Sequence, residues 1–314
     1  MSAESDPAVS VRFWGVRGSI PSPGPETTHY GANTSCLELR ADNQILILDA
    51  GCGLRPLGLK LEEEFGANGF EATLLITHTH WDHIQGLPFC ASAYRDSNRI
   101  RILTPPGRRA QILAALENQM QPMHFPVRFG ALSAITALEE LPAAGKSIGH
   151  VRIAATDLNH PEGCGGYRLD VDGVSVAFLP DHEPYHSSTL RDAASAGAKA
   201  AEKRLAAFIH RCDLLILDTQ YDEAEYPMRR GWGHGCVADS VALAIAGEVR
   251  ELVLFHHDPS HSDAKLAQIL ARAEELIREA GSSLLVRAAR EGDEICLSPA
   301  PPSGTAGPVA LSCS

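Results

Sequence analysis

The stretch Leu74-Leu-Ile-Thr-His78-Thr-His80-Trp-Asp82-His83-Ile-Gln-Gly86 places three of the 14 histidines of the chain within six residues, directly after a short apolar run. Residues two apart on extended backbone point to the same side, so His78 and His80 should project together from the end of a strand. Asp82 and His83 follow where a helix would begin, and Asp82 would suit the N-cap position. Imidazole and carboxylate groups that converge at a strand end are the ligands that a borderline cation such as zinc requires. The spacing therefore predicts a metal centre rather than a set of solvated loop histidines.

The charge balance narrows the classes of partner. The chain has 314 residues, with 27 Lys or Arg against 39 Asp or Glu, so its formal net charge is −12. Tight sequence-independent binding of nucleic acid depends on Lys and Arg that neutralise phosphates, which makes a long nucleic acid an unfavourable partner here. No stretch approaches the roughly 18 consecutive apolar residues of a membrane helix, and the first residues lack the features of a secretory signal. We therefore expect a cytoplasmic protein with no membrane partner.

The organisation of the chain predicts one folded domain over residues 9–298 between two tails, 1–8 and 299–314, whose composition is typical of disorder. Strands are expected at Val9–Trp14, Ile45–Leu48, Thr73–Ile76, Arg101–Leu103, Val174–Leu179, Leu214–Leu217, Leu252–Phe255 and Ser283–Val286. Helices are expected at Gly107–Asn118, Ser187–Ile209, Asp239–Ala246 and Asp263–Ala280. Strands followed by helices predict an α/β fold in which helices cover the sheets.

Two motifs carry a resemblance to a known family. His78-Thr-His80-Trp-Asp82-His83 resembles the signature of the metallo-β-lactamase-fold hydrolases, and Phe13-Trp-Gly-Val-Arg-Gly-Ser-Ile-Pro21 is similar to the opening of their ribonuclease Z and phosphodiesterase-like branch. This resemblance implies a four-layer αββα sandwich with a dinuclear metal site at one edge of the two sheets. It also implies that the loop Gly15–Asn33 lies beside the metals.

The resemblance implies where the remaining metal ligands lie. His160 matches the third histidine of the family, and Asp181, after the apolar run that ends at Pro180, matches its bridging aspartate. His256 follows Leu252–Phe255 at the position of the last histidine. The neighbouring His257 makes this assignment ambiguous by one residue, and the register directly after the strand favours His256. One metal would be held by His78, His80 and His160 and the other by Asp82, His83 and His256, with Asp181 spanning both. Two zinc ions are the first choice and manganese the second, because these ligand types do not fix the metal.

A further histidine is expected to act in catalysis. Gly231-Trp-Gly-His234-Gly resembles the Gly-His motif of the ribonuclease Z-like branch, in which this histidine assists phosphodiester cleavage outside the metal ligands. Asp218 ends the apolar run Leu214–Leu217 and is placed to accept a hydrogen bond from His234. The implied mechanism is attack of a metal-bridging hydroxide on phosphorus, with His234 donating to a phosphoryl or leaving-group oxygen and Asp82 needed for the reaction. The alternative for His234 is a loop histidine whose hydrogen bonds are satisfied within the fold, and the alternative for Asp181 is a turn residue.

The expected substrate is a small phosphodiester, such as a cyclic nucleotide or another cyclic phosphate. The chain is acidic, and the Ala-rich insertion Ser187–Ile209 differs from the Gly/Lys-rich arm with which ribonuclease Z proteins hold tRNA. Three alternatives stay open: a thioester or lactone hydrolase of the same fold, an RNA-processing nuclease, and a non-catalytic metal-binding sensor domain. The oligomeric state stays open between a monomer and a homodimer.

Overall fold

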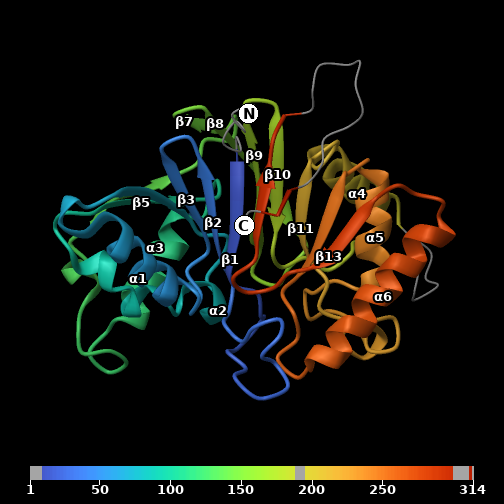
Figure 1. The fold of residues 1–314 in the computed structure, drawn as a ribbon, viewed down its shortest axis with the longest axis horizontal. Helices are drawn as coiled ribbons and strands as arrows, with labels where there is room; N and C mark the ends of the chain where they lie inside the picture. The colour runs from blue at the N-terminus through green and yellow to red at the C-terminus, as the bar shows by residue number, and fades with distance from the viewer. Residues whose placement is uncertain (1–8, 188–194, 300–310, 313–314) are drawn as a thin grey trace, which may run out of the picture.

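The computed structural model describes residues 9–187, 195–299 and 311–312. Figure 1 shows two β-sheets packed face to face between two sets of helices, which is the four-layer αββα arrangement expected from the sequence. Of the tails expected to be disordered, 1–8 lies outside the described residues, and so does 299–314 apart from residue 299 and the pair 311–312.

The first sheet has eight strands in the order β15-β14-β1-β2-β3-β4-β5-β6. Neighbours from β15 to β3 are antiparallel, and those from β3 to β6 are parallel. The bounds are β1 Val9–Gly15, β2 Cys36–Ala41, β3 Gln44–Leu48, β4 Glu71–Leu75, β5 Arg99–Thr104, β6 Ile135–Glu140, β14 Glu294–Leu297 and β15 Leu311–Ser312.

The second sheet has seven strands in the order β13-β12-β11-β10-β9-β8-β7. Neighbours from β7 to β10 are antiparallel, and those from β10 to β13 are parallel. The bounds are β7 Lys146–Ile148, β8 Val151–Leu158, β9 Cys164–Val171, β10 Val174–Leu179, β11 Leu214–Asp218, β12 Glu251–Phe255 and β13 Leu285–Ala288.

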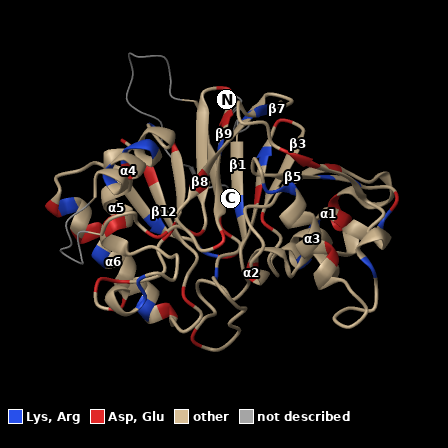
Figure 2. Cartoon of the chain, turned by 180° about the vertical axis from the view of Figure 1, so that it is seen from behind, with Lys and Arg blue, Asp and Glu red and all other residues tan. Residues whose placement is uncertain are grey.

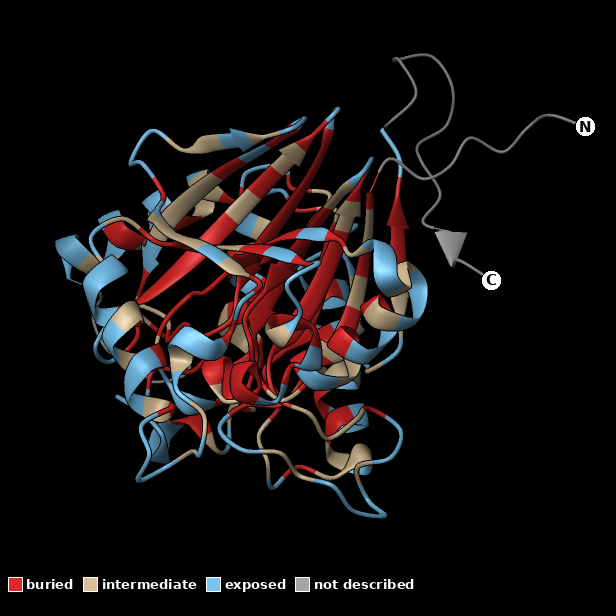
Figure 3. Ribbon diagram, turned by 90° about the vertical axis from the view of Figure 1, so that its left-hand side faces the viewer, coloured by how far each residue is buried: buried red, intermediate tan, exposed pale blue. Residues whose placement is uncertain are grey.

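Six α-helices lie in the described residues: α1 Leu54–Phe65, α2 Trp81–Ile84, α3 Arg109–Gln119, α4 Ala196–Phe208, α5 Val237–Ala246 and α6 Asp263–Glu279. Apolar residues of α1 and α3 pack on the outer face of the first sheet, and those of α4, α5 and α6 pack on the outer face of the second. A third cluster, which includes Phe13, Phe178 and Phe255, fills the space between the sheets. Figure 3 shows the buried residues concentrated along the strands. None of the helices in the described part of the chain has the length and apolar character needed to span a bilayer.

The structure differs from the sequence predictions in several elements. Seven strands have no counterpart among the predicted ones, namely β2, β6, β7, β8, β9, β14 and β15. The last predicted strand, Ser283–Val286, is displaced by two residues to β13. Of the predicted helix Ser187–Ile209, α4 covers Ala196–Phe208 with Ser195 as its N-cap, and residues 188–194 lie outside the described ranges. Helix α1 has no counterpart among the predictions because it contains Pro56 and Gly58, which favour turns over helices. Pro56 is tolerated in the first turn, where its missing N–H has no partner to lose.

The topology brings the ends of several strands to one edge of the sandwich. Strands β10, β11 and β12 are parallel, so Asp181, Asp218 and His256, which follow or end them, lie at the same edge of the second sheet. His78 follows β4 of the first sheet. Polar side chains from both sheets therefore meet where the two sheets end.

Candidate metal centre

Seven histidine and aspartate side chains meet at this edge in two groups. The donor atoms of His78, His80, His160 and Asp181 all lie within 4.8 Å of one another. The donor atoms of Asp82, His83 and His256 form a second group under the same limit. All seven except the exposed His80 are buried. The structure thus brings together the residues that the sequence singled out as ligands.

The carboxylate of Asp181 lies between the two groups. Its Oδ2 is 3.6 Å from Nε2 of His78 and 3.6 Å from Nε2 of His160. Its Oδ1 is 3.0 Å from Nε2 of His83 and 3.3 Å from Nε2 of His256. Each oxygen of one carboxylate therefore faces a different group of donors.

Some of these nitrogen and oxygen atoms lack a hydrogen-bond partner within the protein, as expected for atoms that bind a cation. Nε2 of His78 and Oδ1 of Asp181 are buried without a hydrogen-bond partner, which is costly unless another group satisfies them. Nε2 of His160 lies 3.0 Å from Nδ1 of His80, and because Nδ1 of His160 donates to the Gly233 carbonyl, Nε2 of a neutral His160 is an acceptor that a cation can also engage. Burial would lower the pKa of His83, but the carboxylates of Asp181, Asp82 and Asp49 raise it well above its usual range. The site demands positive charge, and its nitrogen and oxygen donors suit a divalent metal such as zinc.

Asp49, which sequence reasoning missed, orients two of these histidines. Nδ1 of His83 donates to Asp49 Oδ2 at 2.7 Å, and the Thr77 hydroxyl donates to the same carboxylate at 2.9 Å. Because that hydroxyl has one hydrogen, it must accept from Nδ1 of His78, which lies 3.1 Å away. Both rings therefore keep Nε2 free for a metal. The available signal was that Asp49 follows a buried strand, as Asp181 does.

The structure shows which of the adjacent residues His256 and His257 faces the other metal-binding side chains. His256 adopts a left-handed backbone (φ 60°) directly after β12, and its Nε2 lies 3.1 Å from Oδ2 of Asp82. The ring of His257 instead donates through Nε2 to the Ala289 carbonyl at 2.9 Å. Burial lowers the pKa of His257 to about 3, so that ring is neutral. His256 is the histidine that faces the other donors.

The loop Gly15–Asn33 contacts the second group of donors. The Ser19 N–H donates to Oδ2 of Asp82 at 2.8 Å, and a Cβ at Gly18 would lie 2.4 Å from the His256 ring. The prediction that Asp82 caps a helix is wrong: His80 is the N-cap of α2, and Asp82 lies in its first turn. The carboxylate of Asp82 is directed at His256 and Ser19 instead of at the helix N–H groups.

His234 lies beside the seven donors. Its Nδ1 is 2.9 Å from Oδ2 of Asp218 and 3.9 Å from Oδ2 of Asp181. Its ring stacks on that of His256, with centroids 4.9 Å apart and planes inclined by 21°. Asp218 is fully buried at the end of β11. The pair His234 and Asp218 thus forms a hydrogen-bonded imidazole and carboxylate at the border of the cluster.

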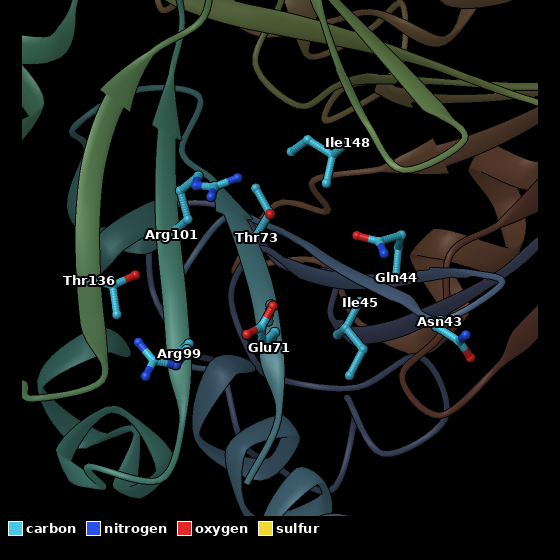
Figure 4. Close-up of a pocket in the computed structure, with 10 residues that line it drawn as sticks. Asn43, Gln44, Ile45, Glu71, Thr73, Arg99, Arg101, Thr136 and Ile148 are labelled. Carbon is cyan, nitrogen blue, oxygen red and sulfur yellow. The ribbon is translucent and has the colours of Figure 1, made fainter.

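A separate cavity of about 280 Å³ lies at the other end of the first sheet (Figure 4). Its lining includes Glu71 and Thr73 from the start of β4 and Arg99 and Arg101 from the start of β5. His78 follows the opposite end of β4, so this cavity is distinct from the cluster of donors.

Comparison with known proteins identifies the family. Residues 46–257 match the family model described as the β-lactamase superfamily domain. The chain belongs to this superfamily. Ribonuclease Z of Shouchella clausii (strain KSM-K16) is 24% identical over 287 residues, which cover 79% of this chain and 86% of that protein. Among solved structures, yeast PDE1 superposes with a TM-score of 0.66 at 15% identity, covering 93% of this chain and 100% of that one. The metallo-β-lactamase fold protein YhfI from Bacillus subtilis gives 0.65 at 16% identity, covering 92% and 99%.

Membership of the β-lactamase superfamily confirms the fold and the family that the sequence motifs indicated. It also confirms that the protein is a metal-dependent hydrolase. Divalent metal binding follows for the superfamily domain, and the two groups of histidine and aspartate donors are where this chain can provide it.

We expect the wild-type protein to bind two divalent metals per chain and His256→Ala to lose about one of them, because one donor group then keeps only two of its three side chains. His257→Gln is the matched control, since its amide can still donate to the Ala289 carbonyl. Elemental analysis by plasma mass spectrometry after dialysis measures the number of metal ions bound per chain. Loss of metal from His257→Gln with full retention in His256→Ala would reverse the assignment.

Proposed function

We propose that the protein hydrolyses small phosphodiesters at two divalent metals, with zinc as first choice and manganese as second. His78, His80 and His160 would hold one metal, Asp82, His83 and His256 the other, and Asp181 both. The observation that carries the proposal is the pair His234 and Asp218, hydrogen-bonded at 2.9 Å. His234 also lies within ligand distance of Asp181 and His256, so its ring borders the atoms that would hold the metals. A metal centre with an adjacent proton donor suits a reaction in which an oxygen leaving group must be protonated.

The side chains of the cluster have separable tasks. Divalent metals bound there would supply Lewis-acid activation of water and would stabilise negative charge on a phosphoryl oxygen. Asp218 accepts from Nδ1–H of His234, which leaves Nε2 of the ring for the substrate. Held in this orientation, Nε2 of His234 would carry the proton that passes to the leaving oxygen. Asp82 would be needed throughout because it belongs to a metal group and contacts His256.

Relatives and charge together support a small substrate. The name ribonuclease Z implies that such relatives cleave the phosphodiester bonds of RNA. This chain carries a net charge of −12, and Figure 2 shows acidic and basic residues interspersed over the helices on both sides of the sandwich. Long RNA requires many phosphate contacts with Lys and Arg, whereas one small diester requires only the charge at the metals.

Two exposed tryptophans next to the cluster support a nucleotide as that substrate. Trp81 follows His80 and is 77% exposed, and Trp232 lies two residues before His234 and is 56% exposed. The Arg229 guanidinium carbon lies 4.8 Å from the centroid of the Trp232 ring. An aromatic face backed by a guanidinium suits stacking with a nucleobase. A cyclic nucleotide therefore fits the charge and these aromatic residues better than a thioester or lactone does.

We expect His234→Ala to lower kcat for bis(p-nitrophenyl) phosphate by roughly 10²-fold or more, which is typical of a lost general acid, while the metal content stays unchanged. His210→Ala, an exposed histidine before the start of β11 and far from its Asp218 end, should behave as wild type. Steady-state kinetics with parallel elemental analysis measure both effects. Wild-type turnover by His234→Ala would remove this residue from the mechanism.

We expect the metal-loaded protein to prefer cyclic nucleotides over linear RNA and over thioesters, because its acidic surface repels long polyanions. Values of kcat/KM for 2′,3′- and 3′,5′-cyclic nucleotides, an unstructured RNA, a tRNA precursor and an acyl thioester measure the preference. Preferred cleavage of RNA would make the protein a nuclease. Preferred cleavage of the thioester would move it to another branch of the superfamily, and absence of all these activities in a protein with two metals would favour a sensor.

A further inference from the structure

Glu183 is a buried carboxylate that belongs to neither donor group, yet it is hydrogen-bonded to the loop that carries His234. We propose that Glu183 is a positioning residue for this proton donor: it fixes the backbone of Gly231–Gly233, so that His234 stays aligned with the metal centre. This inference rests on the function proposed above for His234. Glu183 itself contacts no donor atom of the two groups.

Three groups of the chain donate hydrogen bonds to the Glu183 carboxylate. The N–H of Gly231 lies 2.8 Å from Oε1 and 3.0 Å from Oε2, and the N–H of Gly233 lies 2.9 Å from Oε2. The Tyr226 hydroxyl donates to Oε1 at 3.0 Å. The Glu183 residue is only 8% exposed, so its charge depends on these hydrogen bonds in place of water.

The loop needs its two glycines to make this arrangement. Gly231 and Gly233 have φ values of 85° and 88°, in the left-handed region that side chains disfavour. In this conformation, two nearby N–H groups turn toward one anion, as in the backbone concavities that bind anions elsewhere. A Cβ at Gly233 would also lie 2.3 Å from Nδ1 of His160. The loop is therefore shaped around an anion, and the anion is a side chain of the protein.

Gly233 connects Glu183 to both neighbouring histidines. Its N–H donates to Glu183, its carbonyl accepts from Nδ1 of His160 at 2.9 Å, and its peptide bond leads to His234. Any displacement of Gly233 must therefore move the start of His234 or weaken the hydrogen bond that orients His160. Gly233 is hydrogen-bonded at both its N–H and its carbonyl. These two bonds therefore set the distance between His160, a metal ligand, and His234, the proton donor.

Three consecutive residues after β10 tie the site together. Asp181 lies between the donor groups, and the N–H of His182 donates to Oδ2 of Asp218 at 3.1 Å. The N–H of Glu183 donates to the carbonyl of Asn159, the neighbour of His160, at 2.9 Å. One short segment thus sets the positions of the bridging carboxylate, of the carboxylate partner of His234 and of the loop that carries His234.

The test compares Glu183→Gln in the wild-type and His234→Ala backgrounds, with kcat and KM for bis(p-nitrophenyl) phosphate and with metal content. A glutamine keeps the shape but offers one acceptor oxygen and turns an amide N–H₂ toward the loop donors. We expect kcat to fall about tenfold, as for a loss of roughly 1.4 kcal/mol of transition-state stabilisation. KM should change less than about twofold, because binding to the metals is kept, and both metals should be retained. In the His234→Ala background the substitution should cause no further loss, because the residue it positions is absent.

Two further variants complete the design. Tyr226→Phe removes one of the three hydrogen bonds to Glu183. It should lower kcat by less than Glu183→Gln does, and only when His234 is present. This variant replaces Glu183→Gln in the test if Glu183→Gln does not fold. Glu63→Gln removes the same charge from a side chain that is 74% exposed and should leave kcat unchanged. An equal loss in both backgrounds, a loss of metal, or wild-type kcat in Glu183→Gln would overturn the inference. Wild-type kcat in His234→Ala would overturn the role of His234 itself, so the two failures are distinguishable.

Discussion

The carboxylate of Asp181 is the contact on which the rest of the site depends. Its Oδ1 faces His83 and His256 and its Oδ2 faces His78 and His160, so one carboxylate is shared by both groups. His78 and His83 follow a strand of the first sheet, whereas Asp181 and His256 follow strands of the second. The relative position of the two sheets therefore determines whether the centre can form, and the apolar cluster between them sets that position.

The imidazole rings of the centre are held by acceptors from several parts of the chain. Asp49 after β3 accepts from His83, the Gly233 carbonyl accepts from His160, and Asp218 at the end of β11 accepts from His234. Each hydrogen bond selects which ring nitrogen faces the centre. The segment after β10 joins these supports, because the N–H of His182 donates to Asp218 and the N–H of Glu183 donates to the carbonyl of Asn159. This arrangement favours a reaction that needs charge stabilisation and proton transfer at a fixed separation.

The sequence was informative where the chemistry is local. The His-x-His-x-Asp-His spacing and the strand that precedes it lie within a few residues, so four of the seven side chains could be predicted from the local sequence. His160, Asp181 and His256 lie far from this motif in the chain, and only the resemblance to the family implied them. Contacts between distant segments could not be predicted in this way. Asp49 and Glu183 act through partners 34 and 48 residues away, and neither stands in a recognisable motif. The register after the strand favoured His256 over His257, but the left-handed backbone that turns the His256 ring toward Asp82 is not visible in the sequence.

The most direct test of the account is the position of the metals relative to Asp181. Crystals of the zinc-loaded protein, measured on both sides of the zinc absorption edge, would give anomalous difference peaks at the metal positions. The account predicts two peaks, one beside Oδ2 of Asp181 with His78, His80 and His160 and one beside Oδ1 with Asp82, His83 and His256. A single peak, or a pair of which one lies away from Asp181, would contradict it.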